Sequence, residues 1–146
     1  MKSNELLNKK APKINGIDFS DSEHTIVYFY PKDNTSGCTI EAKEFTELLP
    51  KFKKLKTHIY GISKDTEKSH CNFIEKHNLK INLLSDEDHS IQEKYGVWQM
   101  KKFMGREFMG TVRTTFLIDR NGKVTFVWEN VKAFGHAKEV LEKIKT

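Results

Sequence analysis

The residue best suited to chemistry in this sequence is Cys38, which lies three residues after Thr35 and three residues before Glu41. A thiol has an ordinary pKa of about 8.5, so only a few per cent of it is thiolate at neutral pH. A helix N-terminus and a nearby cation stabilise the thiolate, which is the nucleophilic form. The pattern therefore indicates thiol chemistry, and a fast thiol enzyme also needs fixed hydrogen-bond donors around the bond that it breaks.

A strand and a helix are predicted on either side of this cysteine. Residues 25–30 are apolar, β-branched and aromatic, which is typical of a buried strand. A helix is expected over about 36–56, with a kink or early break near Pro50 because proline lacks the backbone donor. Cys38 would then lie in the first helical turn at the carboxyl end of a strand, where open α/β sheets bind ligands.

The loop between that strand and helix carries three further residues of interest. Pro31 would stiffen its entry, and Gly37 would allow another group to approach the backbone closely. The hydroxyl of Thr35 is near enough in sequence to reach the sulfur or a bound oxygen. The alternative for Thr35 is a plain helix N-cap.

The rest of the chain alternates predicted strands and helices. We expect strands at 58–62, 81–84, 112–118 and 124–128, and helices at 65–77, 90–95 and 136–145. Asp65 is the expected N-cap of the helix 65–77, and Asn121-Gly122 predicts a hairpin turn. Residues 97–111, where aromatic residues and methionines stand among glycines, are expected to form a loop packed on the surface. This order indicates an α/β fold.

Length and composition exclude several classes of protein. The 146 residues suit a single domain over 1–146, and no apolar run approaches the roughly 18 residues that a membrane helix needs. The net charge of +5 raises the question of nucleic acid, but the densest basic stretch, 51–56, falls in the last turns of a helix, where cations complement the dipole. No nucleic-acid or membrane partner is expected, and the absence of a signal-like start favours a cytoplasmic protein.

The sequence Pro31-Lys-Asp-Asn-Thr35-Ser-Gly-Cys38 resembles the peroxiredoxin signature Pro-x-x-x-Thr-x-x-Cys. Other stretches resemble the bacterioferritin-comigratory or Q-type subgroup, namely Leu83-Leu-Ser-Asp86, Tyr95-Gly-Val-Trp98, Arg113-Thr-Thr-Phe-Leu-Ile-Asp119 and Gly135-His-Ala-Lys-Glu-Val-Leu141. The resemblance implies a thioredoxin-like fold with a central mixed sheet flanked by helices. It also implies a thiol-dependent peroxidase that reduces hydrogen peroxide and organic hydroperoxides without a cofactor.

The resemblance assigns roles to particular residues. Cys38 would be the peroxidatic nucleophile that becomes a sulfenic acid, Thr35 would bind the peroxide, and Arg113 would supply a guanidinium. Glu41 would orient part of that network, with Pro31 and Gly37 in support. Considered without the family, Arg113 is a cation at the start of a core-like strand, for which a structural salt bridge is an equal alternative.

The second cysteine, Cys71, departs from a common subgroup pattern. Many relatives carry a resolving cysteine five residues after the peroxidatic one, but that position here is Lys43, and Cys71 lies 33 residues after Cys38. Cys71 falls at the border of the inward face of the predicted helix 65–77. Because some relatives resemble this arrangement, an intramolecular Cys38–Cys71 disulfide is expected, with resolution by an external thiol as the alternative. Thioredoxin or a similar thiol would act as reductant, and the protein would be a monomer or weak homodimer.

Two other functions fit the sequence poorly, and a third stays open. A disulfide exchanger of the same fold would need a Cys-x-x-Cys motif, which is absent. A metal site from His70, Cys71 and His77 lacks a spaced ligand set, so no metal is expected. A binding role for the basic surface stays open as an addition. The segment 12–25 is also short for the resembled family, which suggests that the first strands of the family fold are missing or reduced.

Overall fold

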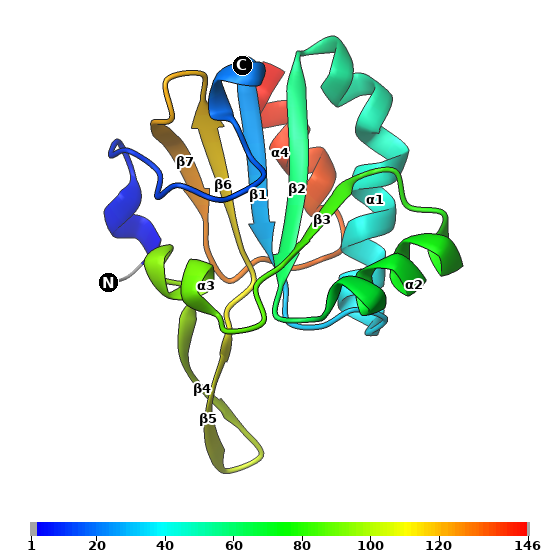
Figure 1. Cartoon of the computed structure of the whole chain (residues 1–146), viewed down its shortest axis with the longest axis vertical. Coiled ribbons are helices and arrows are strands. Elements are labelled where there is room, and N and C mark those ends of the chain that lie inside the picture. Colours follow the sequence, from blue (N-terminus) through cyan, green and yellow to red (C-terminus); the bar gives the residue numbers. More distant parts are fainter. Residues whose placement is uncertain (1–2, 146) are drawn as a thin grey trace.

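The computed structural model describes residues 3–145, and its centre is a five-stranded mixed sheet in the order β3-β2-β1-β6-β7 (Figure 1). The strands are β1 (His24–Phe29), β2 (Thr57–Ser63), β3 (Asn82–Ser85), β6 (Thr114–Asp119) and β7 (Val124–Trp128). The pairs β1/β2 and β2/β3 are parallel, and the pairs β1/β6 and β6/β7 are antiparallel. The expected α/β fold with a central mixed sheet is therefore confirmed.

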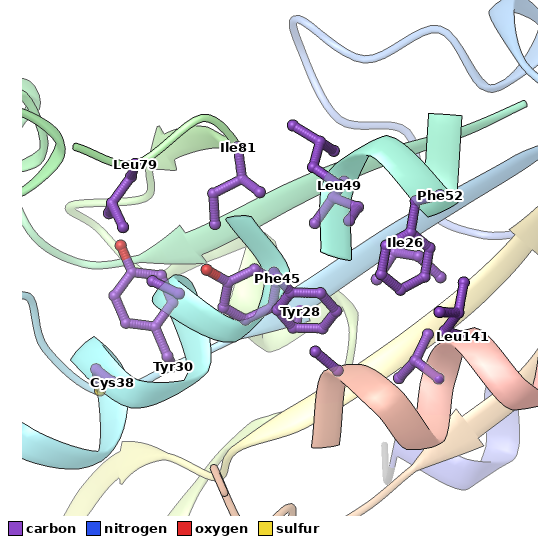
Figure 2. Close-up of a cluster of buried hydrophobic side chains, with 14 of the residues drawn as sticks. Ile26, Tyr28, Tyr30, Cys38, Phe45, Leu49, Phe52, Leu79, Ile81 and Leu141 are labelled. Atoms are coloured by element: carbon purple, nitrogen blue, oxygen red, sulfur yellow. The ribbon is translucent and has the colours of Figure 1, made fainter. Parts of the chain in front are cut away.

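Within residues 3–145, four α-helices accompany the sheet: α1 (Ser36–Lys54), α2 (Glu67–His77), α3 (Ser90–Lys94) and α4 (His136–Lys145). One buried cluster joins α1 and α4 to one face of the sheet, and it includes Phe45, Phe52 and Leu141. Figure 2 shows this cluster, with Cys38 at one end of it beside Tyr30. A second cluster on the other face is built from the N-terminal segment and the region around α3.

The sequence of β1 explains its central position. Its side chains alternate between the two clusters, with Ile26 and Tyr28 in the first and Val27 and Phe29 in the second. Both faces of the strand are buried, so its residues read as a continuous apolar run rather than an alternating one. Strand β1 therefore anchors the start of α1, which begins after a loop of six residues.

The alternative of an early break near Thr46 to Pro50 is wrong, since α1 continues through Pro50 to Lys54. Proline removes one backbone donor, but Pro50 itself lies on the exposed side of the helix. The neighbouring Phe45, Leu49 and Phe52 are all buried in the core, and we infer that their packing keeps the helix continuous.

The expected surface loop at 97–111 is also wrong, because this segment forms an antiparallel hairpin of β4 (Trp98–Phe103) and β5 (Arg106–Thr111). Its turn residues, Met104 and Gly105, have φ values of 52° and 80°. Two positive φ angles are typical of a tight hairpin turn, but methionine rarely occupies the first of them, so the turn has no sequence signal. The hairpin extends away from the central sheet (Figure 1).

The remaining expectations concern helix starts and the N-terminal segment. The N-cap of α2 is Thr66, whose side chain accepts a hydrogen bond from the Ser69 backbone, so the choice of Asp65 is wrong. Before β1, the described residues form only two short 3-10 helices, Ser3–Leu6 and Phe19–Asp21, and one isolated bridge, in line with the expected reduction. No helix within residues 3–145 is long and apolar enough to cross a membrane.

Candidate functional site

Cys38 lies in the first turn of α1, and the side of the helix that carries it faces the core. The backbone N–H groups of this first turn precede any helical acceptor, and the first internal bond runs from the Thr39 N–H to the Thr35 carbonyl. These donors and the positive end of the helix dipole favour an anion at this place. The residue is only 1% exposed, so the sulfur is almost fully covered by its neighbours.

Arg113 is brought to the cysteine by the antiparallel pairing of β6 with β1. Thr114 at the start of β6 lies opposite Phe29 at the end of β1, so the residue before Thr114 falls at the edge where α1 begins. Arg113 Nη2 donates a hydrogen bond to Cys38 Sγ at 3.3 Å, and Arg113 Nη1 donates to Glu41 Oε1 at 2.7 Å. One planar guanidinium therefore bridges the thiol and the carboxylate.

Glu41 lies one helical turn after Cys38 and is completely buried. Burial raises the pKa of Glu41 to about 7, although the charge and hydrogen bond of Arg113 oppose that rise. Burial works against the charge of Arg113 as well, but Glu41 and Cys38 raise the pKa of the guanidinium, which stays charged. The Oε2 atom of Glu41 has no hydrogen-bond partner among the described residues. This carboxyl group is therefore poised to change protonation near neutral pH.

Gly37, Thr35 and Pro31 all lie in the loop that leads to Cys38. A Cβ atom on Gly37 would stand 3.1 Å from Arg113 Nη2, so the glycine leaves room for the guanidinium. Thr35 occupies the N-cap position without capping the helix, and its exposed hydroxyl donates to the Lys32 carbonyl at 2.9 Å. Pro31 is half-buried at the entry of the loop. The structure thus joins Cys38, Arg113, Glu41 and Gly37, while the Thr35 hydroxyl points to Lys32 rather than to the sulfur.

The second cysteine is separate from this group. Cys71 lies in α2, is exposed, and is a free thiol, as is the buried Cys38. The helical face that points inward carries the buried His70 and Phe73, so Cys71 lies outside it rather than at a half-buried border.

Sequence patterns did not identify two residues that lie near the site. Lys101 on β4 donates from Nζ to the Thr111 carbonyl at 3.0 Å. Burial lowers the pKa of Lys101, and the charge of Arg113 adds to this effect while Cys38 opposes it, so the amine is within electrostatic reach of the site. Tyr28 on β1 has a buried hydroxyl without a hydrogen-bond partner in the part of the chain that the structure describes. Lys101 could be found only by recognising the hairpin, whose turn carries no signal.

The described residues contain one group with the composition of a metal site, formed by Asp33, Asp65 and His70. It differs from the His70, Cys71 and His77 combination that the sequence suggested. His70 Nδ1 lies 2.7 Å from Asp33 Oδ2, and Nε2 lies 3.0 Å from the Leu84 carbonyl. Both ring nitrogens face acceptors and must carry protons, so the imidazole has no lone pair to offer a metal ion.

Comparison with known proteins finds similar sequences over most of the chain. The AhpC/TSA family matches residues 2–127. Peroxiredoxin Bcp of Bacillus subtilis is 43% identical over 123 residues, which cover 84% of this chain and 78% of the relative. Peroxiredoxin Bcp of Escherichia coli K12 is 39% identical over 140 residues, covering 96% and 89% of the two chains.

Solved structures of similar proteins also match this chain. The bacterioferritin comigratory protein of Xanthomonas campestris, studied for its alkyl peroxide reduction activity, superposes with a TM-score of 0.82 at 39% identity, covering 86% of this chain and 80% of that one. BcpB of Mycobacterium tuberculosis superposes with a TM-score of 0.76 at 30% identity, covering 87% and 81%. The thioredoxin-like fold is therefore confirmed, and the chain belongs to the AhpC/TSA family as a peroxiredoxin of the Bcp or Q type.

Proposed function

We propose that this peroxiredoxin reduces hydrogen peroxide and organic hydroperoxides with Cys38 as the attacking thiolate. The observation that carries the proposal is the Arg113 guanidinium, which contacts Cys38 Sγ at 3.3 Å and Glu41 Oε1 at 2.7 Å. The cation stabilises negative charge on the sulfur, and its donors lie where the oxygens of a peroxide would approach. Positioned donors of this kind are most effective in a buried site such as this one.

In the proposed step, the Cys38 thiolate attacks one oxygen of the peroxide in line with the O–O bond. The S–O bond forms as the O–O bond breaks, which leaves a sulfenic acid on Cys38 and releases hydroxide or alkoxide that takes up a proton. Arg113 and the N–H groups of the first turn of α1 stabilise the charge on the leaving oxygen. Glu41, with its pKa of about 7, holds the other arm of the guanidinium.

The proposal gives supporting roles to three loop residues. Gly37 leaves space for the guanidinium, and Pro31 restrains the loop entry. Thr35 binds the peroxide in this proposal, which requires its hydroxyl to rotate away from the Lys32 carbonyl. A threonine hydroxyl on an exposed loop rotates readily, since it breaks only one hydrogen bond to do so.

We further propose that Cys71 resolves the sulfenic acid and that thioredoxin or a similar thiol reduces the resulting disulfide. Cys71 is exposed in α2, where an incoming sulfenate and a reductant can reach it. Because Cys38 is buried, the segment around it must open locally before the two sulfurs can reach the geometry that a disulfide bond requires. The protein would work as a cytoplasmic monomer or weak homodimer without a cofactor or nucleic acid.

The test uses the wild type with Cys38→Ser and Cys71→Ser variants. Peroxide consumption coupled to a thioredoxin system should be abolished in Cys38→Ser and strongly reduced in Cys71→Ser. Intact-mass analysis without reductant should find a Cys38–Cys71 bridge in the oxidised wild type. Turnover that survives Cys38→Ser would refute the peroxidase assignment, and an oxidised wild type with free Cys71 would refute its resolving role.

A further inference from the structure

A second buried polar cluster lies next to the thiol site and takes no part in the proposed peroxide step. The Asp33 carboxylate is at its centre, where Oδ1 accepts from the Tyr30 hydroxyl at 2.7 Å. Oδ2 accepts from His70 Nδ1 at 2.7 Å and from Ser69 Oγ at 2.8 Å. The side chains of His70 and Asp33 are 4% and 1% exposed. We call Tyr30, Asp33, Ser69 and His70 the latch.

The geometry around His70 makes the latch an ion pair. Nε2 faces the Leu84 carbonyl at 3.0 Å, and a carbonyl can only accept, so Nε2 carries a proton. Nδ1 lies 2.7 Å from Asp33 Oδ2 and 3.3 Å from the Tyr30 hydroxyl. Since that hydroxyl donates to Asp33 Oδ1 at 2.7 Å, Nδ1 donates to the carboxylate as well. A ring that donates from both nitrogens is an imidazolium, which makes this a charge-assisted bond.

The electrostatics of the latch agree with that protonation state. Burial opposes the charge on His70, but the hydrogen bond and charge of Asp33, the Leu84 carbonyl and the charge of Asp65 raise the pKa of the imidazole. Burial likewise opposes the charge on Asp33, while bonds from His70, Tyr30 and Ser69 lower the pKa of the carboxyl group. Each partner therefore stabilises the charged form of the other.

The position of the latch relates it to the two cysteines. Asp33 lies in the loop between β1 and α1, five residues before Cys38, and its backbone N–H donates to Asp65 Oδ2 at 2.8 Å. His70 is the residue before Cys71 in α2. The same ion pair thus fastens the loop that leads to the buried thiol onto the helix that carries the exposed one.

We propose that Asp33 and His70 are positioning residues that set how fast the oxidised Cys38 loop opens toward Cys71. The inference rests on the proposed function, since it assigns a control over the resolving step of that same site. The closed latch keeps Cys38 beside Arg113 for attack on the peroxide. It must loosen before the loop and the first turn of α1 can leave the core.

The rate at which the Cys38 loop opens has a chemical consequence. In the resolving step the Cys71 sulfur attacks the Cys38 sulfenic sulfur, the S–S bond forms, the S–O bond breaks, and the oxygen leaves as water. A sulfenic acid that waits in the closed site can instead react with a second peroxide and become a sulfinic acid. The strength of the latch therefore sets the balance between turnover and overoxidation.

The main test is Asp33→Asn, which keeps the size of the side chain and removes its charge. Asp86→Asn is the matched control, because Asp86 is also buried and accepts from the Ile91 and Gln92 backbones, but it does not join the two cysteine segments. Each protein is mixed with one equivalent of peroxide, quenched at intervals, alkylated and weighed as an intact chain. Since a hydrogen bond to a charged group contributes about 1.5–3 kcal/mol, Asp33→Asn should form the bridge about tenfold faster or more.

The control should stay within about twofold of the wild type, and excess peroxide should overoxidise Asp33→Asn less than the wild type. Ser69→Ala removes a single bond to Asp33 and is a milder second variant, with an expected acceleration of several-fold. Bridge formation in both variants at the rate of the wild type would overturn the latch, as would an equal acceleration in Asp86→Asn.

A second measurement separates failure of the latch from failure of the proposed function. If the wild type forms no Cys38–Cys71 bridge, the resolving role of Cys71 fails, and the latch is tested in Cys71→Ser proteins. There, the Cys38 sulfenic acid is trapped with a cyclic 1,3-dione. Trapping should be about tenfold faster when Asp33→Asn is added, and an unchanged trapping rate would overturn the latch independently of Cys71.

Discussion

Replacement of Arg113 by lysine tests the proposed mechanism most directly. Arg113 uses two nitrogens for two partners, Cys38 and Glu41, at 3.3 Å and 2.7 Å. A lysine keeps the positive charge but has one nitrogen on a flexible stem, so it cannot reproduce the planar fork. Loss of one charged hydrogen bond costs about 1.5–3 kcal/mol, and each 1.36 kcal/mol corresponds to about tenfold in rate. We therefore expect Cys38 oxidation to slow by about 10- to 100-fold.

The assay is stopped-flow measurement of the second-order rate of Cys38 oxidation by hydrogen peroxide. Arg120→Lys is the matched control, because it makes the same substitution at an exposed arginine, and its rate should equal that of the wild type. Thermal unfolding of both variants checks that the buried Glu41 has not destabilised the protein. An Arg113→Lys protein that is folded and oxidised within twofold of the wild-type rate would refute the role given to the guanidinium.

Three further predictions follow from the same structure. Burial raises the pKa of Glu41 from 4.5 to about 7, so between these pH values the folded state binds a proton that the unfolded state has lost. The unfolding free energy should therefore fall by roughly 3 kcal/mol as the pH rises from about 4.5 to 7. Glu41→Gln should remove this slope in pH-dependent denaturation. Gly37→Ala should slow peroxide oxidation several-fold with little change in melting temperature, since its Cβ would press on Arg113 Nη2 from 3.1 Å; an unchanged rate would mean that the guanidinium moves freely. Phe45→Ala should cost about 3–5 kcal/mol in chemical denaturation because the ring is fully buried, whereas Phe134→Ala, at a position 83% exposed, should cost almost nothing.

Strand β1 and helix α1, which flank the loop before Cys38, illustrate what sequence patterns predict well. The apolar run of β1 and the helical spacing of α1 are local signals, and both elements form close to the expected bounds. The Asn121-Gly122 turn likewise joins β6 and β7 as expected, with Gly122 at a φ of 82°. These features are readable because each depends on neighbouring residues only.

Local sequence patterns did not predict the hairpin β4/β5 or the continuity of α1. The turn at Met104 and Gly105 lacks the usual residue types, and most side chains of β4 and β5 are exposed or half-buried, so no clear alternation marks the strands. The helix continues past Pro50 because distant parts of the core pack on Phe45, Leu49 and Phe52. In the helix, tertiary packing overrides the low helical propensity of proline.

The sequence alone predicted the candidate nucleophile Cys38, the strand and helix around it, and the family resemblance, because these depend on residue type and short spacing. Only the tertiary structure placed Arg113 against Cys38 across 75 positions, through the pairing of β6 with β1. It also joined Asp33 to His70 and showed one thiol buried and the other exposed. Contacts between distant segments depend on strand register and helix packing, which no local pattern encodes.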